Sequence, residues 1–220
     1  MDVLSRLDDA RSAINVLEHP FYQRWSAGEL GADELALYAG EYRAAVVALA
    51  DASALAASKA GPEHAPGLAR HADEESSHVQ LWDQFAEAAG ARSPKSAEQA
   101  VLVETDSCAQ AWTAGEQLLE HLAVLYAIEA SQPEIAQTKL EGLAEHYGYR
   151  PEGPAVEYFT LHERLDREHA RQARELIVDL MSDVEDVDEL TELMVTRACA
   201  ALQGNWELLD GVELAARDAR

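Results

Sequence analysis

The residues best suited to chemistry lie between Tyr158 and Met181, where acid and imidazole groups interrupt the apolar stripe of a predicted helix. His162, Asp166 and His169 follow the three- and four-residue steps that place side chains on one helix face. A buried ionised carboxylate is costly unless an opposite charge or a metal compensates it. Because imidazole nitrogen and carboxylate oxygen together suit iron, manganese or zinc, this face predicts metal ligands.

A second predicted helix, from about Ala65 to Ala89, carries a similar interruption. Glu75 and His78 are three residues apart on its apolar stripe, a spacing by which one helix of a di-iron bundle gives a metal both a carboxylate and an imidazole. Glu74 flanks the stripe one turn before His78, so helix geometry alone leaves Glu74 and Glu75 as rival ligands. Stabilisation of the helix dipole does not explain this acidic pair, because the pair lies in mid-helix.

A third carboxylate, Glu129, ends the apolar stripe of a helix predicted from about Glu104 to Ser131. Each interruption alone has a plainer explanation, either a core histidine with satisfied hydrogen bonds or a half-exposed acid at a helix end. Together, three carboxylates and three imidazoles suffice for two metal ions with open positions, as in non-haem di-iron or iron-manganese centres. A zinc hydrolase is the competing hypothesis, although it more often needs one ion and three ligands.

Lys139, one of only three lysines, lies on the inward arc of a helix predicted over residues 133–148. Snorkelling of the amine to the surface is the usual explanation for such a lysine. A desolvated lysine, however, has a lowered pKa and can act as an amine nucleophile or donor. Tyr22 lies in a short predicted aromatic turn, for which core packing is the simplest interpretation.

These side chains need helices to position them, and the composition predicts an all-α fold. Alanine, leucine and glutamate dominate, and there is no alternating run of β-branched residues. The chain is of a size for one compact domain spanning residues 1–220, without a separating linker. We expect helices at about 3–18, 33–60, 65–89, 104–131, 133–148, 158–181 and 185–215, with a loop through Gly90, Pro94 and Lys95.

Charge and targeting signals limit the partners. The net charge of -24, from 41 acidic and 17 basic residues, disfavours nucleic acid and anionic membranes as partners. No signal peptide, lipidation motif or long apolar run is present, so we expect a soluble cytoplasmic protein. Cys108 and Cys199 lack CxxC spacing and predict neither a disulfide framework nor a structural zinc site. Apolar positions over 190–209 favour a homodimer.

Four stretches resemble the haem-oxygenase-like superfamily, and most closely the family of the chlamydial death-domain-associating protein, the self-sacrificing p-aminobenzoate synthases. The last two stretches are specific to that family, whereas the first is shared more loosely with pyrroloquinoline quinone synthases and thiaminase II proteins. The resemblance implies a bundle of about seven to eight helices. In chain order the stretches are HPFYQRWSAGEL (19–30), DEESSHVQLWDQFAEAAG (73–90), LYAIEASQPEIAQTKLEGLAEHYGY (125–149) and EYFTLHERLDREHARQARELI (157–177).

The resemblance also implies roles for individual residues. A di-iron or iron-manganese centre would activate dioxygen with an external reductant, and the tyrosine at position 22 would be cleaved to supply the ring of p-aminobenzoate for folate synthesis. Lys139 would give the amine, and Tyr38 falls on another tyrosine of the family. Glu74 and Glu75 both remain candidates, because the segment before His78 is shorter than in the death-domain-associating protein. The implied ligands are Glu74 or Glu75, His78, Glu129, His162, Asp166 and His169.

Other functions are also compatible with this sequence. One is a multi-turnover oxygenase of the same superfamily that acts on an amino acid or a fatty acid. A pyrroloquinoline quinone synthase is disfavoured by the full ligand set, and Cys108 is a poor match for a thiaminase nucleophile. A non-enzymatic regulatory or binding protein would not need the ligands at all.

Overall fold

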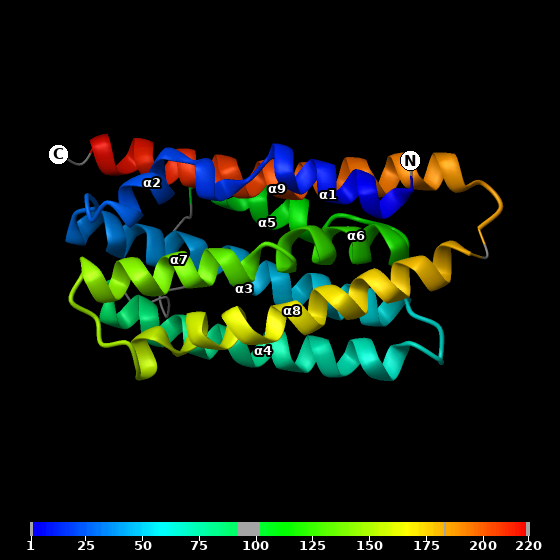
Figure 1. Ribbon diagram of the computed structural model, residues 1–220, viewed down its shortest axis with the longest axis horizontal. Helices are drawn as coiled ribbons and strands as arrows, with labels where there is room; N and C mark the ends of the chain where they lie inside the picture. Colours follow the sequence, from blue (N-terminus) through cyan, green and yellow to red (C-terminus); the bar gives the residue numbers. More distant parts are fainter. Residues whose placement is uncertain (1, 92–101, 183, 219–220) are drawn as a thin grey trace.

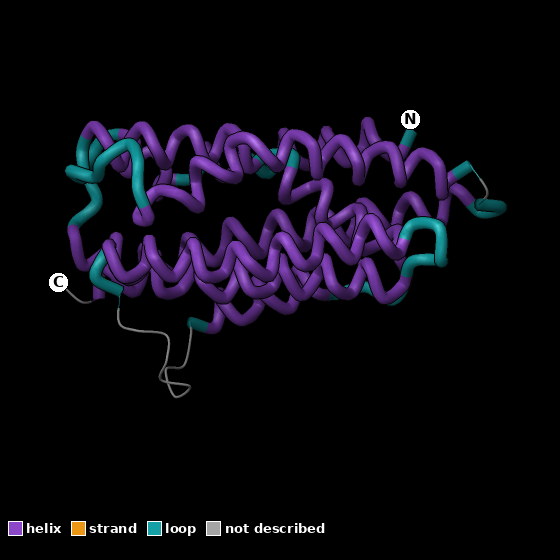
Figure 2. The backbone as a smooth tube through the Cα atoms, turned by 90° about the horizontal axis from the view of Figure 1, so that it is seen from below, coloured by secondary structure: helices purple, strands orange, loops and turns teal. Residues whose placement is uncertain are grey.

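The structure is a computed structural model that describes residues 2–91, 102–182 and 184–218. In these ranges the chain forms helices joined by loops, without a strand, which confirms the all-α prediction (Figure 2). No helix in the described ranges is long and apolar enough to cross a membrane. The elements are α1 (Val3–Ala13), the 3-10 helix η1 (Val16–Glu18), α2 (Pro20–Ser26), α3 (Ala32–Lys59), α4 (Ala65–Ala88), α5 (Val103–Thr113), α6 (Leu118–Glu129), α7 (Gln132–Glu145), α8 (Pro154–Met181) and α9 (Val187–Asp218).

The long helices α3, α4, α8 and α9 run along the length of an elongated bundle, with α9 and α4 at opposite edges in Figure 1. The helix α8 packs against α4, α6 and α7, and α3 packs against α4, α5 and α6. The apolar faces of these helices form one core that includes the fully buried rings of Tyr38, Trp82 and Phe159. Because α8 contacts both α4 and α6, side chains from all three can meet inside the bundle.

The helix predicted over 104–131 is instead two helices, α5 and α6, separated at residues 114–117. Gly115 has a φ of +152°, which side-chain-bearing residues rarely adopt, and a Cβ there would lie 3.1 Å from the ring of His121. The Glu120 carboxylate accepts hydrogen bonds from the backbone N–H groups of Glu116 and Gln117, each at 3.1 Å, and so caps the start of α6. The prediction of one helix was wrong because it treated Gly115 as an interior helical residue.

The N-terminal segment also differs from the prediction. The first helix ends at Ala13 instead of continuing to residue 18, and the predicted aromatic turn is the short helix α2. Pro20 occupies the first position of α2, where its missing N–H has no cost, and the His19 side chain accepts a hydrogen bond from the N–H of Phe21 at 3.0 Å. In the predicted loop after α4, Pro94 and Lys95 lie outside the described residues.

The apolar positions of α9 pack within the chain. Met194, Ala198, Leu202 and Leu209 are buried in the chain's own core. Leu190 and Trp206 in the same range are only partly buried, and the homodimer stays a prediction.

Candidate metal centre

A cluster of acids and imidazoles lies buried where α4, α6 and α8 meet. All but one of its side chains are almost completely buried, and His71 is 12% exposed. The cluster therefore combines three carboxylates and four imidazoles in a place from which water is largely excluded. Its members are His71, Glu75 and His78 from α4, Glu129 from α6, and His162, Asp166 and His169 from α8.

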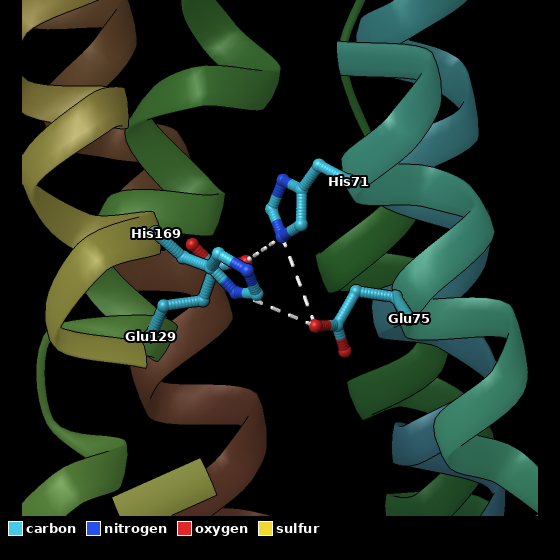
Figure 3. A group of neighbouring side chains, drawn as sticks. All are labelled: His71, Glu75, Glu129 and His169. Carbon is cyan, nitrogen blue, oxygen red and sulfur yellow. Dashed lines mark ion pairs between the residues drawn. The ribbon is translucent and has the colours of Figure 1, made fainter. Parts of the chain in front are cut away.

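Four of these side chains form one compact group, shown in Figure 3. His71 Nε2 lies 2.9 Å from Glu129 Oε1 and 3.7 Å from Glu75 Oε1. His169 Nδ1 approaches the same oxygen of Glu75 to 3.6 Å. One potential ligand atom from each of the four residues lies within 4.8 Å of the others, which is close enough for a single ion to contact all four.

A second group shares Glu75 with the first. His78 Nδ1 lies 3.2 Å from Glu75 Oε1, and His162 Nε2 lies 3.9 Å from Glu75 Oε2. The carboxylate of Glu75 thus stands between the two groups, as a bridging ligand would. Asp166, the remaining member of the cluster, belongs to neither group but has Oδ1 3.5 Å from His169 Nδ1.

The inward atoms of the cluster approach one another closely but lack hydrogen bonds. Buried polar groups in native proteins nearly always have a partner. Bound cations would supply that partner, because each of these atoms has a lone pair available to an ion, so the residues fit a metal centre. The atoms are His71 Nε2, Glu75 Oε1, His78 Nδ1, both carboxylate oxygens of Glu129 and of Asp166, His162 Nε2 and His169 Nδ1.

The outward nitrogens of two imidazoles are held by other groups. His162 Nδ1 donates to the backbone carbonyl of Tyr158 at 2.7 Å, which leaves the lone pair of Nε2 facing the cluster. His169 Nε2 lies 3.2 Å from Glu74 Oε2. Such outer partners fix the orientation of metal-binding histidines. Geometry thus places Glu75 inside the cluster, and the half-exposed Glu74 holds His169 from outside.

Burial and neighbouring charges shift the pKa values of the cluster residues in opposite directions. Burial alone would raise the pKa of Glu75, but His162 and His78 outweigh it and leave this pKa below its usual value. Burial raises the pKa of Glu129, which His71 only partly offsets. Burial would lower the pKa of His169, but Asp166 and nearby carboxylates raise it to about 9. Because an ion must displace the protons on these imidazoles, metal binding should be stronger at higher pH.

Lys139 does not snorkel to the surface. Its side chain is fully buried, and Nζ lies 4.7 Å from the ring centre of Tyr42, 5.5 Å from that of Tyr38 and 5.6 Å from that of Tyr22. The rings of Trp82 and Phe159 complete the surroundings at 5.6 and 5.3 Å. Burial in this aromatic box lowers the pKa of Lys139 to about 7, so the neutral amine is well populated at neutral pH.

Tyr22 lies in the same box as Lys139. Its hydroxyl is 3.4 Å from that of Tyr38, and burial raises the pKa of both phenols well above 10. Both rings are therefore held as neutral phenols next to an amine that is partly neutral. The arrangement places the predicted ring source and the predicted amine side by side.

Aromatic rings connect the box to the acid and imidazole cluster. The Tyr158 ring stacks on His162 with centroids 4.0 Å apart, and Trp82 meets Tyr158 edge to face at 4.9 Å. The Trp82 ring in turn contacts Tyr38 at 6.0 Å. A continuous series of ring contacts thus leads from an imidazole of the cluster to the neighbour of Tyr22.

Two features of the site went unrecognised in the sequence. His71 lies four residues before Glu75 and seven before His78, so it shares their helix face, and that spacing could have identified it. The connecting rings of Trp82 and Tyr158 carried no signal beyond ordinary core packing. Their role depends on which helices become neighbours.

Known proteins resemble this chain in sequence. The model of the family described as iron-containing redox enzymes matches residues 41–206. The 4-aminobenzoate synthase of Chlamydia muridarum is 35% identical over 205 residues, covering 87% of this chain and 84% of that protein. The 4-aminobenzoate synthase of Nitrosomonas europaea is 29% identical over 226 residues, covering 94% and 89%.

Solved structures agree on the fold. A TenA homologue from Pseudomonas syringae pv. tomato has a TM-score of 0.82 at 16% identity, covering 96% of this chain and 91% of that one. A domain of unknown function with a heme oxygenase-like fold from Shewanella denitrificans has a TM-score of 0.78 at 17% identity, covering 97% and 91%. The resemblance expected from the sequence is therefore confirmed, and the chain belongs to the family of iron-containing redox enzymes, built on the haem-oxygenase-like fold.

Proposed function

We propose that this oxidoreductase is a 4-aminobenzoate (p-aminobenzoate) synthase that consumes its own Tyr22 and takes the amine from Lys139. The observation that carries the proposal is the buried amine of Lys139 beside the Tyr22 ring, in a box joined by ring contacts to the acid and imidazole cluster. The names of the relatives from Chlamydia muridarum and Nitrosomonas europaea support the same product.

The product defines the bonds that must change. 4-Aminobenzoate carries a carboxylate para to an amine, and a tyrosine ring carries Cβ para to a phenol oxygen. The Cα–Cβ bond of Tyr22 must therefore break, and Cβ must be oxidised to a carboxylate. The nitrogen of Lys139 must replace the phenol oxygen, so the Cε–Nζ bond of Lys139 must break and the oxygen must leave as water. We propose dioxygen as the oxidant and an external reductant as the source of the remaining electrons. Bound iron, or iron with manganese, would supply the dioxygen activation that side chains lack.

The surrounding residues prepare the two reacting groups. The lowered pKa of Lys139 leaves a lone pair on the amine at neutral pH, which a nitrogen donor needs. Burial keeps the phenol proton on Tyr22, and the hydroxyl of Tyr38 lies next to it. Because the box is fully buried, water is kept from intermediates that it would hydrolyse.

Metal reconstitution tests this function. The metal-free chain is loaded anaerobically with iron, or with iron and manganese, and then exposed to air with a reductant. We expect 4-aminobenzoate in the filtrate, no more than one molecule per chain, and a matching decrease in the whole-protein mass located at both Tyr22 and Lys139. An unchanged mass without product in every metal combination would contradict the proposal.

Substitution of the two neighbouring glutamates should separate their roles. We expect Glu75→Gln to lower the affinity for both ions, because the Glu75 carboxylate faces both groups of potential ligands. Glu74→Gln should leave two ions bound, because the half-exposed Glu74 contacts only the outer nitrogen of His169 in the cluster. Elemental analysis after dialysis measures both, and circular dichroism controls for folding. Equal metal loss in the two variants would contradict this assignment.

A further inference from the structure

We infer that His71 is a metal ligand in its own right, and that it creates an outer metal position distinct from an inner one at His78 and His162. The inference rests on the proposed metal centre and assigns this chain a fourth imidazole. It follows from the contacts of His71 and from the position of a surface pocket.

The first observation is the pairing of His71 with Glu129. Glu129 Oε1 lies 2.9 Å from His71 Nε2, yet neither atom has a hydrogen bond of acceptable geometry, and the carboxylate is fully buried. Two atoms that approach so closely without hydrogen-bond alignment are arranged as ligands converging on one point. The rings of His71 and His169 are also close, with centroids 4.3 Å apart, so their inward nitrogens face the same space.

The second observation is a pocket of about 550 Å³ between α4 and α8. Both His71 and His169 line it, while Arg70, Gln172 and Glu175 on its lining are exposed to solvent. None of the other cluster residues lines this pocket. The group that contains His71 therefore has a route to solvent, and the group that contains His78 and His162 lies behind it.

The two positions should consequently exchange ions at different rates. An ion held by His71, Glu129 and His169 can be reached by a small chelator through the pocket. An ion at His78 and His162 would be enclosed on the opposite side, where the Tyr158 ring stacks on His162 and the Trp82 ring packs edge to face behind Tyr158. Glu75 would be shared by both positions. Removal of His71 should therefore empty the outer position and spare the inner one.

Manganese binding under anaerobic conditions tests the inference, because no turnover consumes the chain. Metal-free wild-type protein is titrated with Mn²⁺ and followed by calorimetry and electron paramagnetic resonance. We expect two ions per chain, with the spectrum of a coupled pair, and removal by a chelator in a fast and a slow phase. His71→Leu should bind one ion, show an uncoupled spectrum and retain only the slow phase.

His64→Leu is the matched control, since His64 lines the same pocket but lies outside both groups of potential ligands. It should bind two coupled ions. Thermal unfolding checks that each variant is folded, and His71→Gln replaces His71→Leu if the latter is not. Two coupled ions in a folded His71 variant, with both chelator phases kept, would overturn the role of His71. Failure of the wild type to bind any ion would instead overturn the proposed metal centre.

Discussion

Tyr22→Phe is expected to abolish formation of 4-aminobenzoate while leaving metal binding and folding nearly unchanged. Phenylalanine keeps the ring and Cβ but lacks the para oxygen that the nitrogen must replace. The hydroxyl of Tyr22 makes a long contact of 3.4 Å with that of Tyr38, so its removal should cost only a fraction of a typical hydrogen bond, under about 1 kcal/mol. Loss of product would therefore not reflect loss of structure.

The measurement is product per chain after aerobic reconstitution, together with the intact mass of the variant. Tyr126→Phe is the control, because the Tyr126 hydroxyl donates a hydrogen bond to Asp8 at 2.6 Å and Tyr126 is not one of the rings of the aromatic box around Lys139. Its yield should equal that of the wild type. Wild-type yield from Tyr22→Phe would exclude Tyr22 as the ring source.

The same variant separates self-sacrifice from a multi-turnover oxygenase. The pocket of about 550 Å³ that reaches His71 and His169 has room for a small external substrate. An enzyme of that kind would retain its full activity in Tyr22→Phe and would release more than one product molecule per chain. Consumption of the reductant and dioxygen in repeated cycles, without a change in protein mass, would identify it.

Local pattern was enough to predict much of the candidate site. On α4 and α8 the spacings of Glu75 with His78 and of His162 with His169 follow the helical repeat, and each side chain points inward as expected. The helical repeat alone could not decide between Glu74 and Glu75. Adjacent residues on a helix differ by about 100° in direction, and either can flank an apolar stripe. Only the packing of α8 on α4 decides that Glu75 enters the cluster.

Long-range contacts determined what the sequence could not. Tyr22 and Lys139 lie far apart in the chain, and they meet because α2 and α7 pack against each other. The amine of Lys139 is desolvated because aromatic rings from α2, α3, α4 and α8 surround it. The helix break at Gly115 could have been predicted from the sequence, because glycine inside a helical pattern is a signal for a turn. The pairing of His71 with Glu129 could not have been predicted in this way, because it joins two different helices.

Lys139→Met should abolish 4-aminobenzoate formation and also stabilise the protein near neutral pH. Methionine fills a similar volume and cannot donate nitrogen. In wild type, the unfolded lysine binds a proton below pH 10.5, whereas the buried amine does so only below about pH 7. The unfolded chain therefore carries the extra proton between these values, and the wild-type free energy of unfolding rises with pH across that window.

The Lys139→Met substitution should remove this dependence of the free energy of unfolding on pH. Below about pH 7 the burial of Lys139 has its full destabilising effect. At about 1.4 kcal/mol per pKa unit, the lowered pKa sets an upper limit of roughly 5 kcal/mol on that effect. The advantage of Lys139→Met should shrink as pH rises and vanish near pH 10.5. Urea unfolding at pH 7 and pH 9.5 measures the difference, with Lys59→Met, at an exposed lysine, as the control. A variant less stable than wild type at pH 7 would show that the aromatic rings hold Lys139 as a stabilised cation, which could not donate its nitrogen lone pair.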